Sequence, residues 1–336
     1  MKKIKVGVIG VGYLGEHHAR VYSQLKGVQL AGVVDTDKNR ADEIARRSAT
    51  KPYYDYKDLI DLVDAVSIVV PTPLHYRIAS EFLKNGVDIL LEKPMTTTVS
   101  EAERLLKIAK TKKLILQIGH IERYNSAVKA LESIIDRPMY IESRRFGPFA
   151  DRVSDVDVIL DLMIHDIDIV LSLVDSDIKS IKATGVSVMT SHNDIANAHI
   201  EFKNGCVANL TVSRMSMDKL RKISIYQPET YFTLDYKEQE IILHKRIWNR
   251  VNNRMVPEIS TENIDLIKEE PLKAELSSFI ESVRTRKKPI VSGVEGKKAL
   301  EVALAVLEDT RKRRLLFDED SNGGSKGAIS RHRRRN

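Results

Sequence analysis

The feature that most constrains the fold is a glycine-spaced turn near the start of the chain. An apolar, β-branched run, IKVGVI, ends just before Gly10, and a helix-like run, EHHARVYSQLK, follows Gly15. The turn contains Gly10, Gly12 and Gly15, a spacing typical of a dinucleotide-binding strand–turn–helix unit: the first glycine bends the chain, the second admits a pyrophosphate and the third lets the helix pack closely. Taken alone, the motif also fits an ordinary glycine-containing turn.

The next strand-like run, VQLAGVVD, favours the dinucleotide interpretation. It ends in Asp35, about 20 residues beyond Gly15, where a carboxylate accepts hydrogen bonds from the adenosine ribose hydroxyls. An acid at this position repels a 2′-phosphate, so we expect NAD as the cofactor and NADP less. Lys38 and Arg40 follow closely and are able to soften that preference. A solvated strand end is the alternative for Asp35.

Strand-like and helix-like runs alternate up to about residue 120. The runs AVSIVV, VDILLE and LILQIGH read as strands, and LHYRIASEFLKNG reads as a helix. A further helix follows Thr98, which forms a capping box with Glu101. This alternation predicts an α/β domain over residues 1–120, with a parallel Rossmann sheet covered by helices on both faces.

Ligands of such sheets bind beyond the carboxyl ends of the strands. At these ends, PTPLH forms a rigid lip and LLEKP delivers a lysine. His75 either contacts the cofactor or packs on its own helix, and Lys93 either points its ammonium at a substrate hydroxyl or pairs with Glu92 at the surface. The expected cofactor-binding residues are Gly10, Gly12, Tyr13, Leu14, Gly15, Asp35, Pro71, Thr72, His75, Glu92 and Lys93.

A polar stripe marks the apolar stretch VILDLMIHDIDIVLSLV. On an α-helix, an arc of about 80° contains Asp157, Asp161, His165, Asp168 and Ser172. Apolar residues fill most of the remainder, which Asp166 alone interrupts. Because unpaired polar groups are costly on a buried helix, we expect the stripe to face a cleft.

Within this stripe, Asp161 precedes His165 by one turn. Its carboxylate is placed to orient the imidazole and raise its basicity, as a proton-abstracting base requires. A satisfied, partly buried ion pair is the alternative. We expect no metal, because no second histidine or cysteine lies at a usable spacing.

The amino-acid composition limits the cellular compartment and the partners that we expect. Cys206 is the only cysteine among 336 residues, which excludes an intrachain disulfide and favours a reducing, cytoplasmic compartment. No apolar run approaches the roughly 18 residues of a membrane span. The chain has a net charge of +7. Residues 317–336 contain Lys326, Arg331, Arg333, Arg334 and Arg335, and we expect them to be a disordered basic tail. No aromatic residues alternate with the tail arginines, so we expect no nucleic-acid partner.

Residues 121–316 read as an α+β substrate domain. Strand-like runs from RPMYIESRRF to the segment ending at His244 precede two helix-like stretches near Leu272 and Glu295. A broad sheet with one face left over after the helices pack needs covering, so we expect a homodimer or homotetramer.

Four motifs together resemble the Gfo/Idh/MocA family of glucose-fructose oxidoreductases and inositol dehydrogenases. They are GVIGVGYLG, PTPLH, LEKP and DLMIHDID, and the resemblance covers roughly residues 3–316. It implies an NAD(P)-binding Rossmann domain followed by a domain with an open, mostly antiparallel sheet. By this resemblance Lys93 matches the lysine of an EKP motif. Asp161 and His165 match the substrate-orienting aspartate and catalytic histidine of a DxxxH motif, and Asp168 fits an adjoining position.

The segments GHIERYNSAVKAL and IESRRFGPFADR are similar to a branch of that family that oxidises the 3-hydroxyl of UDP-N-acetylglucosamine. The resemblance implies a 3-keto product, a partner aminotransferase and a place in lipid A biosynthesis. Forked guanidinium groups suit a diphosphate and a tyrosine ring suits stacking. The expected substrate-binding residues are Arg123, Tyr124, Asn125, Arg145, Asp161 and His165.

Arg144 and Arg152 are further possible diphosphate ligands. Consecutive residues of a strand point to opposite faces, so at most one of Arg144 and Arg145 is expected in the site. An exposed salt bridge is the alternative for each arginine. Two other functions stay open: a dehydrogenase of a free sugar or inositol in the same family, and a non-catalytic NAD-binding sensor.

Overall fold

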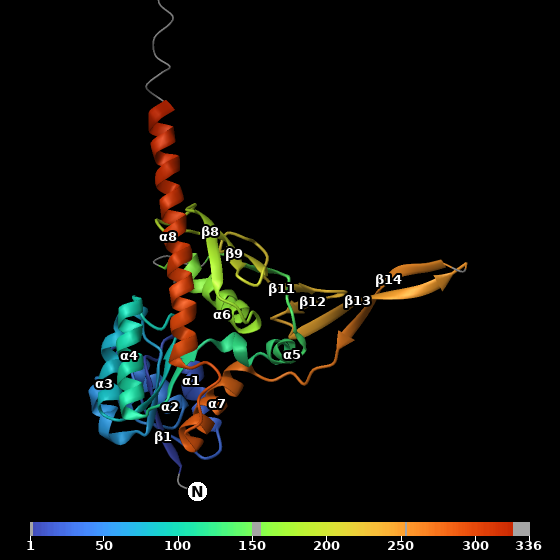
Figure 1. The fold of residues 1–336 in the computed structure, drawn as a ribbon. Helices are drawn as coiled ribbons and strands as arrows, with labels where there is room; N and C mark the ends of the chain where they lie inside the picture. Colours follow the sequence, from blue (N-terminus) through green and yellow to red (C-terminus); the bar gives the residue numbers. More distant parts are fainter. Residues whose placement is uncertain (1–2, 150–155, 253, 325–336) are drawn as a thin grey trace, which may run out of the picture.

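The computed structural model describes residues 3–149, 156–252 and 254–324, which build two sheets (Figure 1). The first is a six-stranded parallel sheet with the order β3-β2-β1-β4-β5-β6, the arrangement of a Rossmann domain. Its strands are β1 (Ile4–Ile9), β2 (Val28–Val34), β3 (Pro52–Tyr53), β4 (Ala65–Ile68), β5 (Asp88–Glu92) and β6 (Leu116–Gly119). The predicted N-terminal sheet is confirmed.

Helices cover both faces of this sheet, so its strands are largely buried. Every residue of β4 and β6 is buried. The helices are α1 (Tyr13–Gln24), α2 (Lys38–Arg47), α3 (Thr72–Lys84) and α4 (Val99–Lys112), with a 3₁₀ turn η1 (Tyr56–Leu62). The capping box of Thr98 and Glu101 starts α4, as predicted, because each side chain bonds the backbone of the other residue.

The second sheet has eight strands in the order β14-β13-β12-β11-β7-β10-β9-β8. Neighbouring strands are antiparallel except β7 and β10, which run parallel. The predicted open, mostly antiparallel sheet is therefore confirmed. Its strands are β7 (Tyr140–Phe146), β8 (Ile178–Val186), β9 (Ile195–Phe202), β10 (Val207–Ser213), β11 (Leu220–Gln227), β12 (Thr230–Asp235), β13 (Glu240–Val251) and β14 (Arg254–Ile264).

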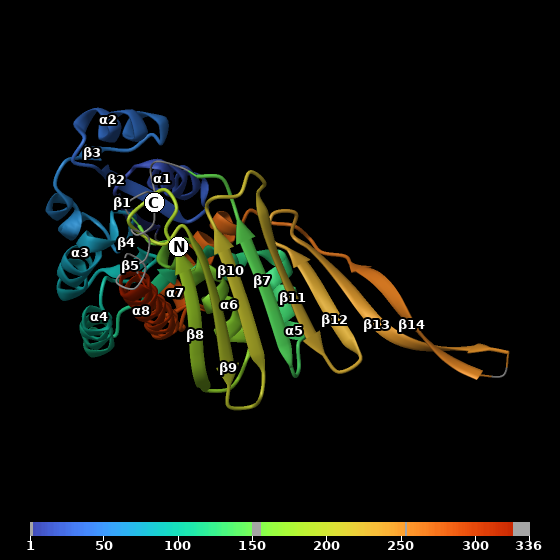
Figure 2. The same ribbon diagram turned by 90° about the horizontal axis from the view of Figure 1, so that it is seen from above.

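Helices pack on only one face of the second sheet. They are α5 (Ser126–Ile134), the π-helical turn η4 (Ile159–Met163) with its continuation α6 (Ile164–Leu173), and α8 (Gly293–Gly324). The other face is turned to the viewer in Figure 2, where no helix covers it and the β13–β14 ribbon projects outward. On this face the rings of Tyr226 and Tyr231 stack at 5.2 Å, and those of Tyr231 and His244 at 4.1 Å.

The end of the chain returns to the first domain. Helix α7 (Pro271–Thr285) contributes Leu276 and Phe279 to the core beside Val8 and Tyr22 of the Rossmann domain. The predicted division into residues 1–120 and 121–316 is thus incomplete, because a linear boundary cannot represent a segment that packs backward.

Helix α8 corrects a second boundary. It runs past both domains and ends at Gly324, whereas a disordered tail was predicted from residue 317 (Figure 1). Residues 325–336 of the predicted tail lie outside the described residues. No helix in residues 3–149, 156–252 or 254–324 has the length and apolarity needed to cross a membrane.

Helix α7 also buries a carboxyl group. Glu275 is 0% exposed, and neither of its carboxyl oxygens has a hydrogen-bond partner among the described residues. Burial first, and then the negative charge of Glu92, raise the pKa of Glu275 well above its usual value. This shift favours the protonated acid in the fold, because an ionised group there would lack compensation.

This raised pKa predicts a stability difference that depends on pH. The unfolded chain ionises Glu275 above about pH 4.5, whereas the folded chain keeps it protonated, so native stability is lost as the pH rises toward the folded-state pKa. The Glu275→Gln variant escapes this loss. Its advantage in unfolding free energy over the native chain should grow with pH by up to roughly 1.4 kcal/mol per unit.

Urea unfolding of both proteins between pH 5 and about pH 8 measures this difference. Glu281→Gln is the matched control, because Glu281 lies on the same helix with a side chain 60% exposed. A difference that stays constant with pH would show that Glu275 is ionised in the fold.

Candidate active site

The glycine turn has the geometry that a bound pyrophosphate requires. Gly10 has a φ of 84°, and a Cβ there would lie 2.5 Å from the carbonyl oxygen of Val69. A Cβ on Gly15 would lie 1.9 Å from the carbonyl oxygen of Gly10, whereas none of the described atoms comes within 4 Å of a Cβ on Gly12. The first and third glycines therefore permit close packing, and the second leaves the turn open to a ligand.

Asp35 lies next to this turn, at the end of β2. Its carboxylate accepts hydrogen bonds at 3.0 Å from the backbone N–H groups of Val11 and Asp37, and a carboxylate keeps further lone pairs for ribose hydroxyls. The Arg40 guanidinium lies 3.8 Å away. A cleft of about 320 Å³ joins the turn to Arg40 and Arg47. These residues fit the adenosine half of a dinucleotide.

The other expected cofactor residues flank the turn, with one correction. Tyr13 and Leu14 begin α1 and are 63% and 50% exposed, and Pro71 and Thr72 begin α3. His75 is instead 1% exposed, with Nδ1 2.9 Å from the Pro94 carbonyl oxygen and Nε2 2.8 Å from that of Val70. It therefore joins two strand-end loops and has no free edge for the cofactor.

Lys93 links the two domains at the end of β5. Its Nζ donates to the backbone carbonyl oxygen of Asp161 at 2.7 Å and to the Asp161 carboxylate at 3.3 Å. Asp161 lies in η4, a π-helical turn of the kind often found at functional sites. The side chains of Lys93 and Asp161 stay 14% and 25% exposed. This contact brings the predicted lysine and aspartate together.

Glu92, also expected at the cofactor, points elsewhere. Its carboxylate lies 3.3 Å from His18 Nε2 on α1, and a Cβ on Gly119 would come within 2.8 Å of it. Burial opposes ionisation, but the hydrogen bond from His18 and the charges of His18 and Lys93 outweigh it and lower the pKa of Glu92. Glu92 is thus a buried counter-charge to His18 and Lys93.

His165 lies on the first turn of α6, with an imidazole that is neutral at physiological pH. Burial first, then the positive charge of Lys93 and that of Arg145, lower its pKa well below the usual value. Its Nδ1 has no hydrogen-bond partner among the described residues. The expected contact with Asp161 is not the one formed, because the Asp161 carboxylate binds Lys93. A neutral imidazole beside a lysine is able to accept a proton.

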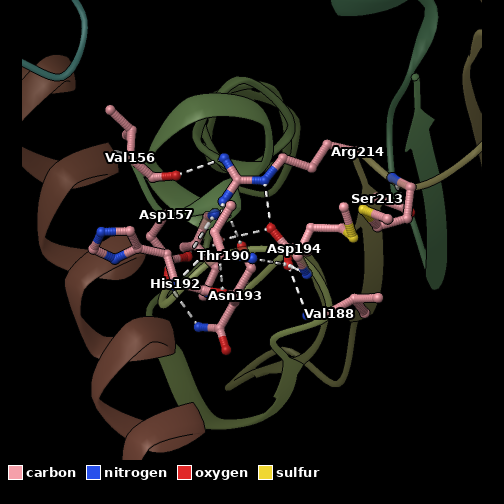
Figure 3. A network of polar contacts seen from close by, with 12 residues as sticks. Val156, Asp157, Val188, Thr190, His192, Asn193, Asp194, Ser213 and Arg214 are labelled. Carbon is pink, nitrogen blue, oxygen red and sulfur yellow. Dashed lines mark hydrogen bonds and ion pairs between the residues drawn. The ribbon is translucent and has the colours of Figure 1, made fainter. Parts of the chain in front are cut away.

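The rest of the predicted polar stripe does not face one cleft. Asp157 accepts hydrogen bonds from the backbone of Ile159 and from Asn193 (Figure 3), and Ser172 donates to Glu132. These residues hold the ends of the helix in place. The predicted stripe therefore includes structural polar residues as well as residues of the candidate site.

Asn193 belongs to a network of polar contacts around the buried ion pair of Asp194 and Arg214. Asp194 is 0% exposed and accepts hydrogen bonds from Arg214, Thr190 and the backbone of Val188 (Figure 3). Backbone hydrogen bonds, led by those from Met189 and Val188, outweigh burial and lower the pKa of Asp194. This network fixes the β8–β9 loop against the start of η4.

Asp168, also in the stripe, lies on the same helix as His165 and is 3% exposed. Its carboxylate is 3.7 Å from Arg123 and 3.9 Å from Nδ1 of His120, whose ring meets that of His165 edge-on at 6.4 Å. Burial raises the pKa of Asp168 to about 7 despite the opposing charge of Arg123. Burial and the charge of Lys93 lower the pKa of His120 to about 3, so this second imidazole is also neutral.

Arg145 forms a buried ion pair with two carboxylates and is therefore not available to bind a diphosphate in this fold. It is 2% exposed, donates to Asp166 through two nitrogens at 3.0 Å each, and donates to Glu122 at 2.8 Å. Asp166, the residue that interrupted the apolar surround of the stripe, is therefore its partner. Arg144 points to the opposite face, half-exposed, and pairs with Glu142. Arg152 lies outside the described residues.

The other expected substrate residues on η2 (Ile121–Tyr124) and at the start of α5 are also internal. Arg123 lies 2.7 Å from Glu132, and Tyr124 is 0% exposed, which leaves no face for a nucleobase. Asn125 caps α5 and donates to the backbone of Tyr236. These side chains do not make the expected contacts with a diphosphate and a nucleobase, because they already contact carboxylates and backbone groups or are fully buried.

Sequence reasoning missed His18 and His120, and it missed Arg221 on β11, whose charge lowers the pKa of His165 after burial and the charges of Lys93, Arg145 and His120. His120 directly follows strand β6, so the rule that ligands gather at carboxyl ends of strands was sufficient to find it. His18 and Arg221 carried no such signal, because their neighbours come from distant segments. In residues 3–149, 156–252 and 254–324, no group of three or more acidic, histidine or cysteine side chains is arranged to hold a metal.

A Rossmann domain joined to a sheet domain, with lysine, aspartate and histidine at the junction, defines a two-domain, dinucleotide-binding oxidoreductase. Family models agree: residues 4–120 match an oxidoreductase family with an NAD-binding Rossmann fold, and residues 127–229 match the GFO/IDH/MocA C-terminal domain. The chain belongs to the Gfo/Idh/MocA family.

Individual relatives support this membership. UDP-N-acetylglucosamine 3-dehydrogenase of Acidithiobacillus ferrooxidans is 36% identical over 91% of this chain and 97% of its own length. A solved structure of that enzyme aligns with a TM-score of 0.86 over 92% of this chain and 98% of the other. The scyllo-inositol 2-dehydrogenase (NAD(+)) of Bacillus subtilis is 28% identical over 92% of this chain and 94% of its own length.

The buried pairing of Arg145 predicts a stability defect. Arg145→Leu leaves Asp166 and Glu122 without their counter-charge and should lower the unfolding free energy by about 3–5 kcal/mol. Arg144→Leu, on the exposed face of the same strand, should change it by less than about 0.5 kcal/mol. Urea unfolding measures both values, and native stability in Arg145→Leu would contradict the structural role.

Proposed function

We propose that this chain is an NAD-dependent dehydrogenase that oxidises the 3-hydroxyl of UDP-N-acetylglucosamine. The observation that carries the proposal is the reach of Lys93, from the Rossmann domain, to Asp161 in the second domain, next to the neutral His165. The relative from Acidithiobacillus ferrooxidans, which matches over nearly the whole chain, supports the choice of substrate.

The chain's residues divide the work by position. Gly10, Gly12 and Gly15 would hold the pyrophosphate of NAD, and Asp35 would bind the adenosine ribose. Tyr13, Leu14, Pro71 and Thr72 would line the rest of the cofactor site. When bound there, NAD supplies the acceptor for the hydride that leaves the alcohol carbon.

The proton of the substrate hydroxyl goes to the chain. His165 accepts it on a ring nitrogen, which its lowered pKa leaves unprotonated before the reaction. The Lys93 ammonium hydrogen-bonds the same oxygen and stabilises the negative charge that develops on it. Asp161 holds the ammonium in place and offers a carboxylate oxygen to the sugar.

A second candidate function has a specific observation in its favour. Arg123 and Arg145, expected to bind a diphosphate, are neutralised by Glu132 and by Asp166 and Glu122. A free sugar or inositol needs no such ligands, and an inositol dehydrogenase is among the relatives. The two functions differ in the substrate that is turned over.

The uncovered face of the second sheet supports a homodimer or homotetramer, with the aromatic row of Tyr226, Tyr231 and His244 inside the interface. For this enzyme we further propose a cytoplasmic location and an aminotransferase that consumes the 3-keto product.

An absorbance assay of reduced nicotinamide tests the substrate. We expect NAD to be reduced with UDP-N-acetylglucosamine and not with its 3-deoxy analogue. Reduction with myo-inositol instead would favour the second candidate. No reduction with any of these compounds would favour a non-catalytic NAD-binding protein.

His165→Ala should lower kcat by roughly 10²–10⁴-fold, because the general base is removed. NAD affinity, followed by calorimetric titration, should stay within about 2-fold, since the cofactor residues are untouched. His199→Ala on β9, with a side chain 36% exposed, is the matched control and should keep native kcat. Loss of NAD affinity in His165→Ala would show that the histidine is misassigned.

Asp35→Ser tests the cofactor preference. Removing the carboxylate relieves repulsion of a 2′-phosphate and leaves Arg40 free to bind it. The ratio of kcat/KM for NADP to that for NAD should rise by at least about 10-fold, or about 1.4 kcal/mol. An unchanged ratio would place Asp35 away from the ribose.

A further inference from the structure

Arg221 lies on the side of the second sheet that faces the candidate site. It is the second residue of β11 and pairs directly with Arg145 of β7. Directly paired residues of neighbouring strands share a face, and Arg145 reaches Asp166 on helix α6. Arg221 therefore projects from the same face as Arg145, toward the helix that carries His165.

The two paired arginines differ in how their charge is balanced. Arg145 is buried and bound to two carboxylates, whereas Arg221 is exposed. No carboxylate pairs with the Arg221 guanidinium in the part of the chain that the structure describes. An exposed guanidinium without a carboxylate partner has donors available to an anion.

Arg221 is also close enough to affect the candidate base. After burial, Lys93, Arg145 and His120, it is a further group whose charge lowers the pKa of His165. His165 and His120 are neutral and Lys93 pairs with Asp161, whereas Arg221 adds a positive charge that no carboxylate among the described residues balances. A substrate with a phosphate near its reacting carbon would be attracted to it.

We infer that Arg221 binds the phosphate groups of the substrate. The inference rests on the proposed function, because a nucleotide sugar carries its diphosphate on carbon 1, two bonds along the ring from carbon 3. With His165 at carbon 3, the diphosphate has to lie on one side of the imidazole, and Arg221 supplies the unpaired forked donor there. Arg221 thus takes the role expected of Arg123 and Arg145.

Calorimetric titration of UDP and steady-state kinetics with UDP-N-acetylglucosamine test the inference in Arg221→Gln, Arg221→Lys and Arg144→Gln. A lost charge-assisted contact should raise the Kd for UDP and the KM by roughly 10–150-fold in Arg221→Gln, with kcat within about 3-fold. Arg221→Lys should recover part of the affinity. Arg144→Gln, on the opposite face, should match the native enzyme.

The outcomes separate the inference from the proposed function. Turnover of UDP-N-acetylglucosamine with the same Kd and KM in Arg221→Gln would overturn the inference alone. Failure of the native enzyme to bind UDP, together with turnover of myo-inositol, would overturn both. A lowered melting temperature in Arg221→Gln, with UDP affinity unchanged at a temperature where it is folded, would assign Arg221 a structural role and overturn the inference.

Discussion

The contact between Lys93 and Asp161 is the interaction on which the site depends. It joins the end of a Rossmann strand to the π-helical turn that precedes α6, and so it sets where His165 lies relative to the cofactor domain. The Lys93 ammonium joins the two domains through its contact with Asp161. After burial, its charge is also the largest cause of the lowered pKa of His165. Substrate and cofactor therefore meet where the domains are already linked.

Around this contact, the fold places its charged groups as internal pairs. The pairs are Arg145 with Asp166 and Glu122, Arg123 with Glu132, and Glu92 with His18. Such pairs add little net stability over apolar packing, but breaking one is costly. They orient the strands and helices that carry the reacting groups. Lys93 pairs with the partly exposed Asp161, and Arg221 has no carboxylate partner among the described residues.

The sequence was sufficient to predict the features that depend on local spacing. The Rossmann sheet, the glycine turn followed by Asp35 and the capping box of Thr98 all follow from short motifs and their order. The contact of Lys93 with Asp161 was not predicted, because the spacing suggested that Asp161 pairs with His165. The arginines were assigned wrongly because a guanidinium looks the same in sequence whether a phosphate or a buried carboxylate binds it. Only the folded contacts, in which Asp166 and Glu122 bind Arg145, separate the two cases. The return of α7 was hidden for the same reason, since it depends on contacts between distant segments.

That return constrains how the chain is able to fold as it is synthesised. Leu276 and Phe279 pack in the hydrophobic core that contains Val6 and Val8 of β1, so the first domain lacks part of its interior until helix α7 has been made. Domains at the start of a chain generally fold first. Here part of the core of the Rossmann domain comes from a helix that is synthesised only after all eight strands of the second sheet.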